Sequence, residues 1–460
     1  MTAATHWAGA RVGVLGLGRS GRAATQLLAQ VGASVYASDS ADNEALRQQA
    51  EALRGLGAEV ELGHHDLGKL ERCDLLVLSP GIPPSAEVLQ SWALQGRPVI
   101  SELELAFRFL DAPVIAVTGT NGKTTTTAWI GAMLERAGAR VGVGGNIGRA
   151  LSEIAADASG SYEWVVVEVS SFQLAYIDSF KPVIGVFLNL CPDHVDWHGS
   201  IERYYADKAR LFDNGDADSC WVLNGEDEEV ARVADGKPGR VQGFWVNSEP
   251  PPGKPGAWLA PDGTLVVRQP DWETELGNRR ELNLLGLHNV ANALAGSLAA
   301  VFARAPLDAV RTELREFRPL PHRLQPVGEL GGVLWINDSK ATNVASARVA
   351  LESMERPVVL LLGGRGKGES FMPLLNALHE HARAVIAYGE AATQAQSELS
   401  EHIRLEREDG PFDQVVARAA ALAEPGDVVL LAPACASFDM FRDYEERGER
   451  FIELVRQRVA

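Results

Sequence analysis

Cysteine is scarce in this sequence, and no two cysteines lie close together. The four are Cys73, Cys191, Cys220 and Cys435, and they form no CxxC pair. Disulfide-stabilised secreted domains need closely spaced cysteines, so this distribution favours a reducing compartment. The N-terminus also lacks the cationic and apolar regions of a signal peptide, and no apolar run approaches the ~18 residues that span a membrane. We therefore expect a soluble, cytoplasmic protein.

Positive charge is also in short supply. The chain has 43 basic and 61 acidic residues, a formal net charge of −18. Nucleic acids and membrane surfaces are anionic, so this excess argues against both as general partners. An anionic substrate would have to be bound by local donors and cations. The apolar share of 46% is ordinary for a globular protein, and 460 residues are too many for one ordinary domain.

The most informative stretch is a phosphate-binding motif near residue 120. An apolar run at 114–117 precedes Gly119-Thr-Asn-Gly-Lys-Thr124, and residues able to begin a helix follow. A strand, a glycine-rich loop and a helix in this order are typical of a P-loop. Glycines let backbone N–H groups approach phosphate oxygens, Lys123 supplies a mobile charge, and the Thr124 hydroxyl can hold Mg²⁺. We predict an ATP or GTP site rather than a plain Gly/Thr-rich turn, although Val117 stands where the common pattern has glycine.

A second glycine-rich turn opens the chain. The strand 11–15 leads into Gly16-Leu-Gly-Arg-Ser-Gly21, and the next strand ends at Asp39. This arrangement is typical of a dinucleotide-binding fingerprint and, taken alone, would suggest NAD. Turns of this kind bind diphosphates in general, so the motif specifies a pyrophosphate more firmly than a nicotinamide.

Three ionisable residues in the middle of the chain are candidates for chemistry. Glu168 ends an apolar strand, where burial without a cation is costly, so a Mg²⁺-directed role is favoured over a solvated edge. His194 follows another strand, and a structural and a functional role are equally compatible with that position. Lys208 shares the apolar face of a helix over 201–212 with Tyr204. That pattern alone favours a snorkelling lysine over a desolvated one with a lowered pKa.

The last third of the chain is again α/β in pattern. A proline-flanked junction at 317–323 follows a turn-rich stretch at 239–281, which we expect to form a small sheet with exposed loops. The loop Gly363-Gly-Arg-Gly-Lys-Gly368 follows an apolar strand and carries two cations, which suggests capture of a carboxylate or phosphate; a surface turn is the alternative. The helix start at 285–292 holds a histidine and two asparagines, which suit either nucleotide contacts or capping.

These patterns predict an α/β protein of three domains. We expect a Rossmann-like domain at 1–105, a central P-loop ATPase-type domain with a parallel sheet at 106–319, and a C-terminal Rossmann-like α/β domain at 320–460. The junction around 317–321 is the candidate hinge between the last two.

Taken together, the motifs resemble those of the Mur ligases, ATP-dependent amide-bond ligases of peptidoglycan synthesis. The resemblance covers all three segments and rests on Gly119–Thr124, Glu168, His194, Leu287-His-Asn-Val-Ala-Asn292 and His322-Arg323. Further matching runs are Gly16–Gly21, Gly145–Gly148, Ser170–Leu174, Asn337–Asn343 and Pro433–Asp439. The resemblance implies that ATP phosphorylates the terminal carboxylate of UDP-N-acetylmuramoyl-L-alanine. The amino group of glutamate would then attack the acyl phosphate, giving ADP and phosphate.

The resemblance also implies roles for individual residues. Lys123, Glu168, His194 and Lys208 would be catalytic. ATP would be bound by Gly119, Thr120, Asn121, Gly122, Lys123, Thr124, Thr125, Asn292, Arg323, Asp338 and Lys340. The UDP substrate would be bound by Gly18, Arg19, Ser20, Asp39, Ser40, Gly81, Asn146, Ser171 and Gln173, and glutamate by Thr342, Lys367, Ser437 and Tyr444. Two Mg²⁺ ions would be held by Thr124, Glu168, His194 and Lys208, the last as a CO2-derived carbamate.

Several alternatives stay open at this point. D-glutamate is the expected amino acid, but an L-glutamate-specific Mur ligase, another Mur ligase or a folylpolyglutamate-type ligase would share much of the pattern. An NAD-dependent dehydrogenase would leave the P-loop and the Lys367 loop unexplained. A regulatory P-loop ATPase would need no second metal centre. We expect a monomer with no nucleic-acid or membrane partner.

Overall fold

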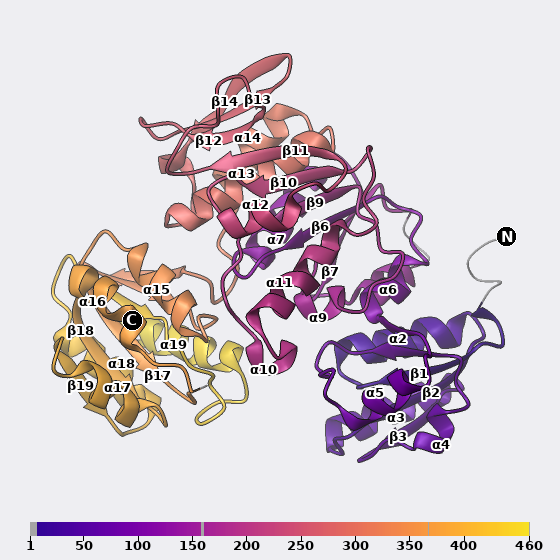
Figure 1. Cartoon of the computed structure of the whole chain (residues 1–460). Coiled ribbons are helices and arrows are strands. Elements are labelled where there is room, and N and C mark those ends of the chain that lie inside the picture. The colour runs from indigo at the N-terminus through magenta and orange to yellow at the C-terminus, as the bar shows by residue number, and fades with distance from the viewer. Residues whose placement is uncertain (1–6, 158–160, 367, 460) are drawn as a thin grey trace. The chain divides into compact units, whose positions relative to one another are not determined.

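The computed structural model describes residues 7–157, 161–366 and 368–459 (Figure 1). The chain forms two compact units, the first reaching to Glu281 and including Ala291–Arg315, and the second made of Leu282–Val290 and the chain from Glu316 onward. Among the described residues, no helix is both long and apolar enough to cross a membrane. Three sheets confirm the predicted three-part α/β fold, and each lies inside one predicted domain range. The exact domain limits stay a prediction.

The first sheet is a five-stranded parallel sheet in the order β3-β2-β1-β4-β5, as in Rossmann-type domains. Its strands are β1 (Arg11–Leu15), β2 (Ser34–Asp39), β3 (Glu59–Leu62), β4 (Leu75–Leu78) and β5 (Val99–Ser101). The helices are α2 (Arg19–Gln30), α3 (Glu44–Gly55), α4 (Leu67–Leu70), α5 (Glu87–Leu94) and α6 (Glu102–Phe107). A Cβ on Gly21 would lie 1.7 Å from the Gly16 carbonyl oxygen, so this turn requires glycine there.

The second sheet has nine strands in the order β14-β13-β12-β11-β10-β9-β6-β8-β7. The strands are β6 (Val114–Thr118), β7 (Val141–Gly145), β8 (Trp164–Glu168), β9 (Ile184–Phe187), β10 (Cys220–Asn224), β11 (Arg240–Trp245), β12 (Gly256–Leu259), β13 (Thr264–Gln269) and β14 (Trp272–Asn278). Strands β6 to β12 pair in parallel, and β12, β13 and β14 pair antiparallel. The strands predicted at 239–281 are present, but they do not form a small sheet by themselves, because they extend the central sheet through the β10–β11 pairing.

The helices of this region connect and cover its strands. They are α7 (Lys123–Arg136), α8 (Leu151–Ala155), α9 (Ser171–Leu174), α10 (Val195–His198), α11 (Ile201–Ala209), α12 (Glu228–Ala234), α13 (Leu287–Phe302) and α14 (Leu307–Glu316), with 3-10 turns η1 (Arg210–Phe212) and η2 (Arg279–Glu281). Strand β6 lies between β8 and β9, and all five of its residues are buried. The phosphate-loop motif therefore begins at a rigid, central strand end.

The third sheet has six strands in the order β15-β16-β20-β17-β18-β19. The strands are β15 (Gln325–Leu330), β16 (Val333–Asn337), β17 (Val358–Gly363), β18 (Ala382–Tyr388), β19 (Leu405–Glu408) and β20 (Val428–Leu431). Only β15 pairs antiparallel within this sheet. The helices are α15 (Val344–Glu352), α16 (Leu375–His381), α17 (Ala392–Leu399), α18 (Phe412–Leu422) and α19 (Tyr444–Val459), with the 3-10 turn η3 (Met372–Leu374).

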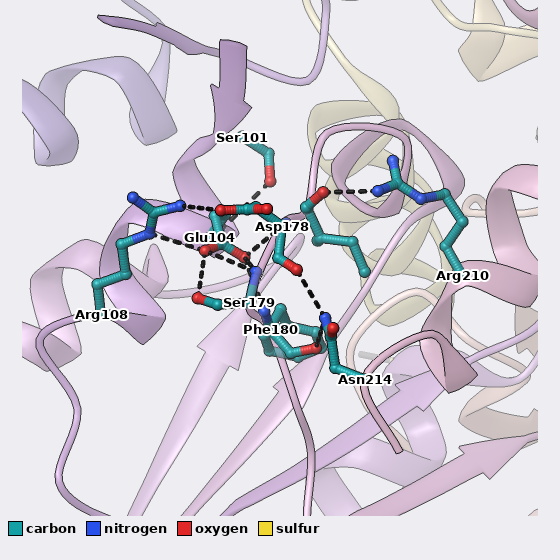
Figure 2. Close-up of polar contacts among 9 residues, drawn as sticks. Ser101, Glu104, Arg108, Asp178, Ser179, Phe180, Arg210 and Asn214 are labelled. Carbon is teal, nitrogen blue, oxygen red and sulfur yellow. Dashed lines mark hydrogen bonds and ion pairs between the residues drawn. The ribbon is translucent and has the colours of Figure 1, made fainter. Parts of the chain in front are cut away.

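A buried carboxylate connects α6 to the segment that leads into β9. Glu104 accepts hydrogen bonds from the backbone N–H groups of Asp178 (3.0 Å), Ser179 (3.1 Å) and Phe180 (2.8 Å) (Figure 2). The Ser179 hydroxyl (2.6 Å) and Arg108 Nε (2.8 Å) also donate to it. Burial raises the pKa of Glu104, but these hydrogen bonds outweigh it and hold the pKa below its ordinary value of 4.5.

Replacing Glu104 by alanine is expected to lower the free energy of unfolding by about 3–5 kcal/mol at neutral pH, because several buried donors lose their acceptor. The folded-state pKa is lowered, so the stabilisation is present above pH 4.5 and is lost as the pH falls through the folded-state pKa. Urea unfolding at pH 7 and at acidic pH measures both effects. Asp178→Ala is the matched control, since that carboxylate pairs with the same Arg108 but is 75% exposed. Equal losses in the two variants would contradict the prediction.

Candidate functional site

The phosphate loop follows β6 and begins α7. Gly119 (φ 147°) and Gly122 (φ 84°) have positive φ, and Lys123 is the first residue of the helix. A Cβ on Gly119 would lie 3.0 Å from Leu188 Cβ, and one on Gly122 would lie 2.4 Å from Asn292 Oδ1. Both glycines are therefore required by close approach as well as by backbone conformation. The structure brings Asn292, predicted from a distant part of the sequence, directly to this loop.

The segment after β9 holds the loop in shape. Asn121 N–H donates to Asn189 Oδ1 at 2.8 Å, and Asn189 Nδ2 donates back to the Asn121 carbonyl at 3.1 Å. The Thr120 hydroxyl forms hydrogen bonds with the Cys191 carbonyl at 3.1 Å and the Tyr204 hydroxyl at 3.0 Å. Sequence reasoning assigned no role to Asn189 or Tyr204, since only the fold shows that they face the loop.

Two lysines donate to one carbonyl of the loop. Lys123 Nζ is 2.9 Å from the Gly119 oxygen and 2.8 Å from the Thr120 oxygen, and Lys208 Nζ is 2.8 Å from the same Gly119 oxygen. Lys208 is only 2% exposed. Burial and the neighbouring Lys123 charge lower the Lys208 pKa well below its ordinary value, although Asp193 and Glu168 oppose this. The snorkelling interpretation of Lys208 is therefore wrong, and its amine is desolvated.

Glu168 is buried at the end of β8, beside the loop that follows β7. Its Oε1 accepts a hydrogen bond from Asn146 Nδ2 at 2.9 Å, and the Asn146 N–H donates to the Glu168 carbonyl at 2.9 Å. Its other carboxylate oxygen, Oε2, is buried and accepts no hydrogen bond from any described residue. A buried anionic oxygen without a donor suits a cation ligand.

His194 caps α10 with a left-handed backbone (φ 50°). Its ring lies edge-on to Phe172 at 4.8 Å between centroids, and its Nε2 is 3.5 Å from Asp193 Oδ2. Burial lowers the pKa of His194; Asp193 opposes this, while Lys208 and Lys123 lower it further. A ring that stays unprotonated can act as a metal ligand. No three His, Cys, Asp or Glu side chains gather as a ready metal site within the described part of the chain.

The diphosphate turn of the first sheet lies next to the loop after β7. Arg19 Nη1 donates to the Gly148 carbonyl at 2.6 Å, so residues predicted for the UDP substrate meet the Asn146–Gly148 segment. The Asp39 carboxylate accepts from the N–H groups of Leu17 (2.7 Å) and Ala41 (2.9 Å), and thereby shapes the turn. Of the other predicted substrate residues, Gly18 and Ser20 flank Arg19 and Ser40 follows Asp39. Gly81 lies in the loop after β4, where Ser79 Cβ is 2.9 Å from the position of a Cβ on Gly16.

Two further predicted substrate residues begin α9 and are buried. The Ser171 hydroxyl is 2.9 Å from His198 Nε2, and Gln173 Oε1 accepts from the Ser170 N–H at 3.0 Å. Sequence reasoning did not find His198, whose only signal is its place in the run Asp193-His-Val-Asp-Trp-His198.

In the second unit, the predicted nucleotide residues after β16 are brought together. Asp338 Oδ1 accepts from the Leu324 N–H at 3.2 Å, and burial raises the pKa of Asp338 to about 7, opposed by that hydrogen bond and by Arg323. Lys340 Nζ lies 3.7 Å from the centroid of the Tyr444 ring, so a predicted ATP residue meets a predicted glutamate residue.

The loops that carry the other predicted glutamate residues share a buried arginine that sequence reasoning missed. Arg447 is fully buried and donates to the Ser339 hydroxyl (2.9 Å), the Ser339 carbonyl (2.9 Å) and the Cys435 carbonyl (3.1 Å). It thus connects the loop before Thr342 to the loop before Ser437. Lys367 lies outside the described residues.

Three family models match successive parts of the chain. Residues 10–101 match the Mur ligase MurD-like N-terminal domain, residues 117–300 the Mur ligase middle domain, and residues 322–435 the Mur ligase glutamate ligase domain.

Curated relatives match over nearly the whole chain. The UDP-N-acetylmuramoylalanine–D-glutamate ligase of Acidobacterium capsulatum is 42% identical over 448 residues, covering 97% of this chain and 96% of that protein. The enzyme of the same name from Koribacter versatilis is 41% identical over 451 residues, covering 98% of both. Among solved structures, MurF ligase from Thermotoga maritima in complex with ADP has a TM-score of 0.59 at 17% identity, covering 99% of this chain and 96% of that one. That likeness concerns the fold.

Proposed function

The chain belongs to the Mur ligase family, and we propose that it is an ATP-dependent ligase that joins D-glutamate to UDP-N-acetylmuramoyl-L-alanine in peptidoglycan synthesis. Relatives that carry this activity in their names align with it over nearly its whole length. The observation that carries the proposal is local: Lys123 and the desolvated Lys208 meet at the Gly119 carbonyl, in the domain that holds the buried Glu168 oxygen. A regulatory ATPase, which only binds ATP as a switch, would not require this combination of Lys123, Lys208 and Glu168.

The loop residues suit an ATP phosphate chain. The backbone of Gly119–Thr125 and the N-terminus of α7 provide N–H donors, and Lys123 provides a full charge that can turn from its loop carbonyls to a phosphate oxygen. Glu168 and Thr124 would hold one Mg²⁺, and His194 and Lys208 a second. Bound there, Mg²⁺ would neutralise charge on the transferring phosphoryl group.

Lys208 is suited to carry a carbamate. Burial beside Lys123 favours its uncharged amine, whose lone pair can attack CO2; a C–N bond forms and one proton leaves. The product is an anionic oxygen ligand in place of an amine. The anionic carbamate would also attract the neighbouring Lys123 ammonium, which the uncharged amine does not, and this supports the modification at this position rather than at an exposed lysine.

The other predicted site residues lie in loops that we assign to the individual substrates. We propose that the turn Gly16–Gly21, with Asp39, Ser40 and Gly81, binds the uridine diphosphate end. The segment around Asn146 would line the path of the muramoyl-alanine portion, which is supported by the contact from Arg19 to Gly148. Arg323, Asp338 and Lys340 would contact the nucleotide, and Thr342, Lys367, Ser437 and Tyr444 the glutamate. Both ATP and the UDP-linked substrate are found in the cytoplasm, so we propose that the enzyme acts there. We also propose that it is a monomer.

The test is phosphate release from ATP with Mg²⁺, UDP-N-acetylmuramoyl-L-alanine and each glutamate enantiomer separately. We expect release with D-glutamate and none above background with L-glutamate. The absence of release with either enantiomer would refute the ligase assignment. Release with L-glutamate alone would leave a Mur ligase but overturn its assigned amino acid.

A further inference from the structure

His198 is a fully buried histidine whose two ring nitrogens both have side-chain partners. Nδ1 is 2.8 Å from Asp207 Oδ2, and Nε2 is 2.9 Å from Ser171 Oγ. The side chains of His198 and Asp207 are 0% and 3% exposed, and Ser171 is 2% exposed. An ionised carboxylate only accepts hydrogen bonds, so Nδ1 donates to Asp207 and the ring orientation is fixed. The three residues form a buried polar network.

The network joins the segments that carry the proposed cation ligands. Ser171 begins α9 and lies three residues after Glu168, the end of β8, and Asp207 immediately precedes Lys208 in α11. His198 ends α10, and α11 packs against both α9 and α10 (Figure 1). The imidazole of His198 is therefore hydrogen-bonded both to the segment that follows Glu168 and to the helix that carries Lys208.

The faces of the same ring reach the third ligand and the phosphate loop. Phe172 stacks on His198 at 5.5 Å between centroids with 17° between planes, and it lies against His194 at 4.8 Å. Tyr204 packs edge-on to His198 at 5.3 Å, and its hydroxyl is bound to Thr120. A change in the position of the His198 ring would thus be felt at His194 and at the loop.

The local backbone cannot supply this order by itself. Helix α10 has only four residues and is flanked by two cap residues with left-handed backbone, His194 (φ 50°) and Gly199 (φ 81°). A single turn is not stable in isolation, so its orientation depends on tertiary contacts. Asp207 has a second partner, Arg203 Nε at 3.1 Å, so this buried carboxylate stays paired when the imidazole is removed.

We propose that His198, held by Asp207 and Ser171, is a positioning residue that fixes the relative places of the three proposed cation ligands. The inference rests on the proposed function, because that function assigns Glu168, His194 and Lys208 to the cation. Partners that hydrogen-bond directly to metal ligands typically contribute about 10- to 100-fold to metal affinity, and His198, which acts through neighbours of the ligands, is expected to reach the lower end of that range.

The experiment measures Mn²⁺ binding in the presence of ADP by electron paramagnetic resonance, in the wild-type protein and in His198→Phe. Phenylalanine keeps the ring contacts and removes both hydrogen bonds. We expect Mn²⁺ affinity to fall about 10-fold while the circular dichroism spectrum is unchanged. His64→Phe is the control, since that side chain is 64% exposed. A folded His198→Phe protein that binds Mn²⁺ within twofold of the unmodified protein would overturn the proposal.

Ser171→Ala keeps the inference testable if His198→Phe does not fold. It removes one hydrogen bond and a single oxygen, and we expect a several-fold loss of Mn²⁺ affinity; unchanged affinity would overturn the proposal. The measurement needs no turnover. A protein without ligase activity in which these variants still lose Mn²⁺ affinity would contradict the proposed function while supporting the role of His198.

Discussion

Replacing Lys123 by methionine is expected to lower kcat for phosphate release about 1,000-fold. The ammonium group lies at the first turn of α7, 2.9 Å and 2.8 Å from two loop carbonyls. From this position the Lys123 ammonium can reach the phosphates of bound ATP. Negative charge develops on the oxygens of the departing ADP during phosphoryl transfer, and the ammonium would stabilise it. Methionine retains the length and the apolar stem, so the loss is that of a positive charge in a partly buried site.

Single-turnover phosphate release at saturating ATP separates this effect from weaker binding. The control is Lys254→Met, which removes an exposed lysine on a turn of the same region of the chain. We expect the control to retain the activity of the unmodified protein. A loss smaller than about tenfold in Lys123→Met at saturating ATP would contradict the catalytic role and leave Lys123 a binding residue only.

Glycine-rich loops were predictable because their information is local. Gly119 and Gly122 occupy positive-φ positions, and close contacts leave no room for a Cβ. Signals of the same local kind predicted the diphosphate turn and the three α/β units. Local patterns could not predict which sheet β12, β13 and β14 join, since their pairing with β11 depends on a register between distant strands.

The polar residues that sequence reasoning missed share one property: their partners are distant in the chain. Asn189 contacts Asn121 across 68 positions, and Arg447 contacts Ser339 across 108. His198 contacts Ser171 across 27 positions. No spacing rule connects such pairs, because the fold alone decides which strand ends meet. Lys208 illustrates the same limit, since an apolar helical face does not reveal whether the amine reaches water.

The second large effect concerns Lys208. Replacing it by methionine is expected to lower kcat about 100- to 1,000-fold, because an anionic ligand for the second cation is lost while the apolar contacts remain. Arginine at this position tests the same point differently: it fills the site with a group that stays positively charged, because its pKa is above about 12, and that forms no carbamate. We therefore expect Lys208→Arg to be as inactive as Lys208→Met. Activity of Lys208→Arg near that of the unmodified protein would refute the carbamate.

The carbamate also has a signature that does not depend on activity. In ¹³C-bicarbonate, the wild-type protein is expected to show one carbamate carbonyl resonance. This resonance should be absent from Lys208→Met and present in Lys254→Met. Selectivity for one lysine follows from desolvation: Lys208 is 2% exposed, and burial beside Lys123 lowers its pKa, whereas an exposed lysine stays protonated and cannot attack CO2.

Removal of CO2 should lower the activity of the wild-type protein. In Lys208→Ala, a small carboxylate such as acetate should restore part of the activity, because it can fill the vacated space. If the wild-type protein shows no such resonance and keeps full activity without CO2, the carbamate is refuted. Lys208 would then act as an amine that donates to the Gly119 carbonyl and holds the loop.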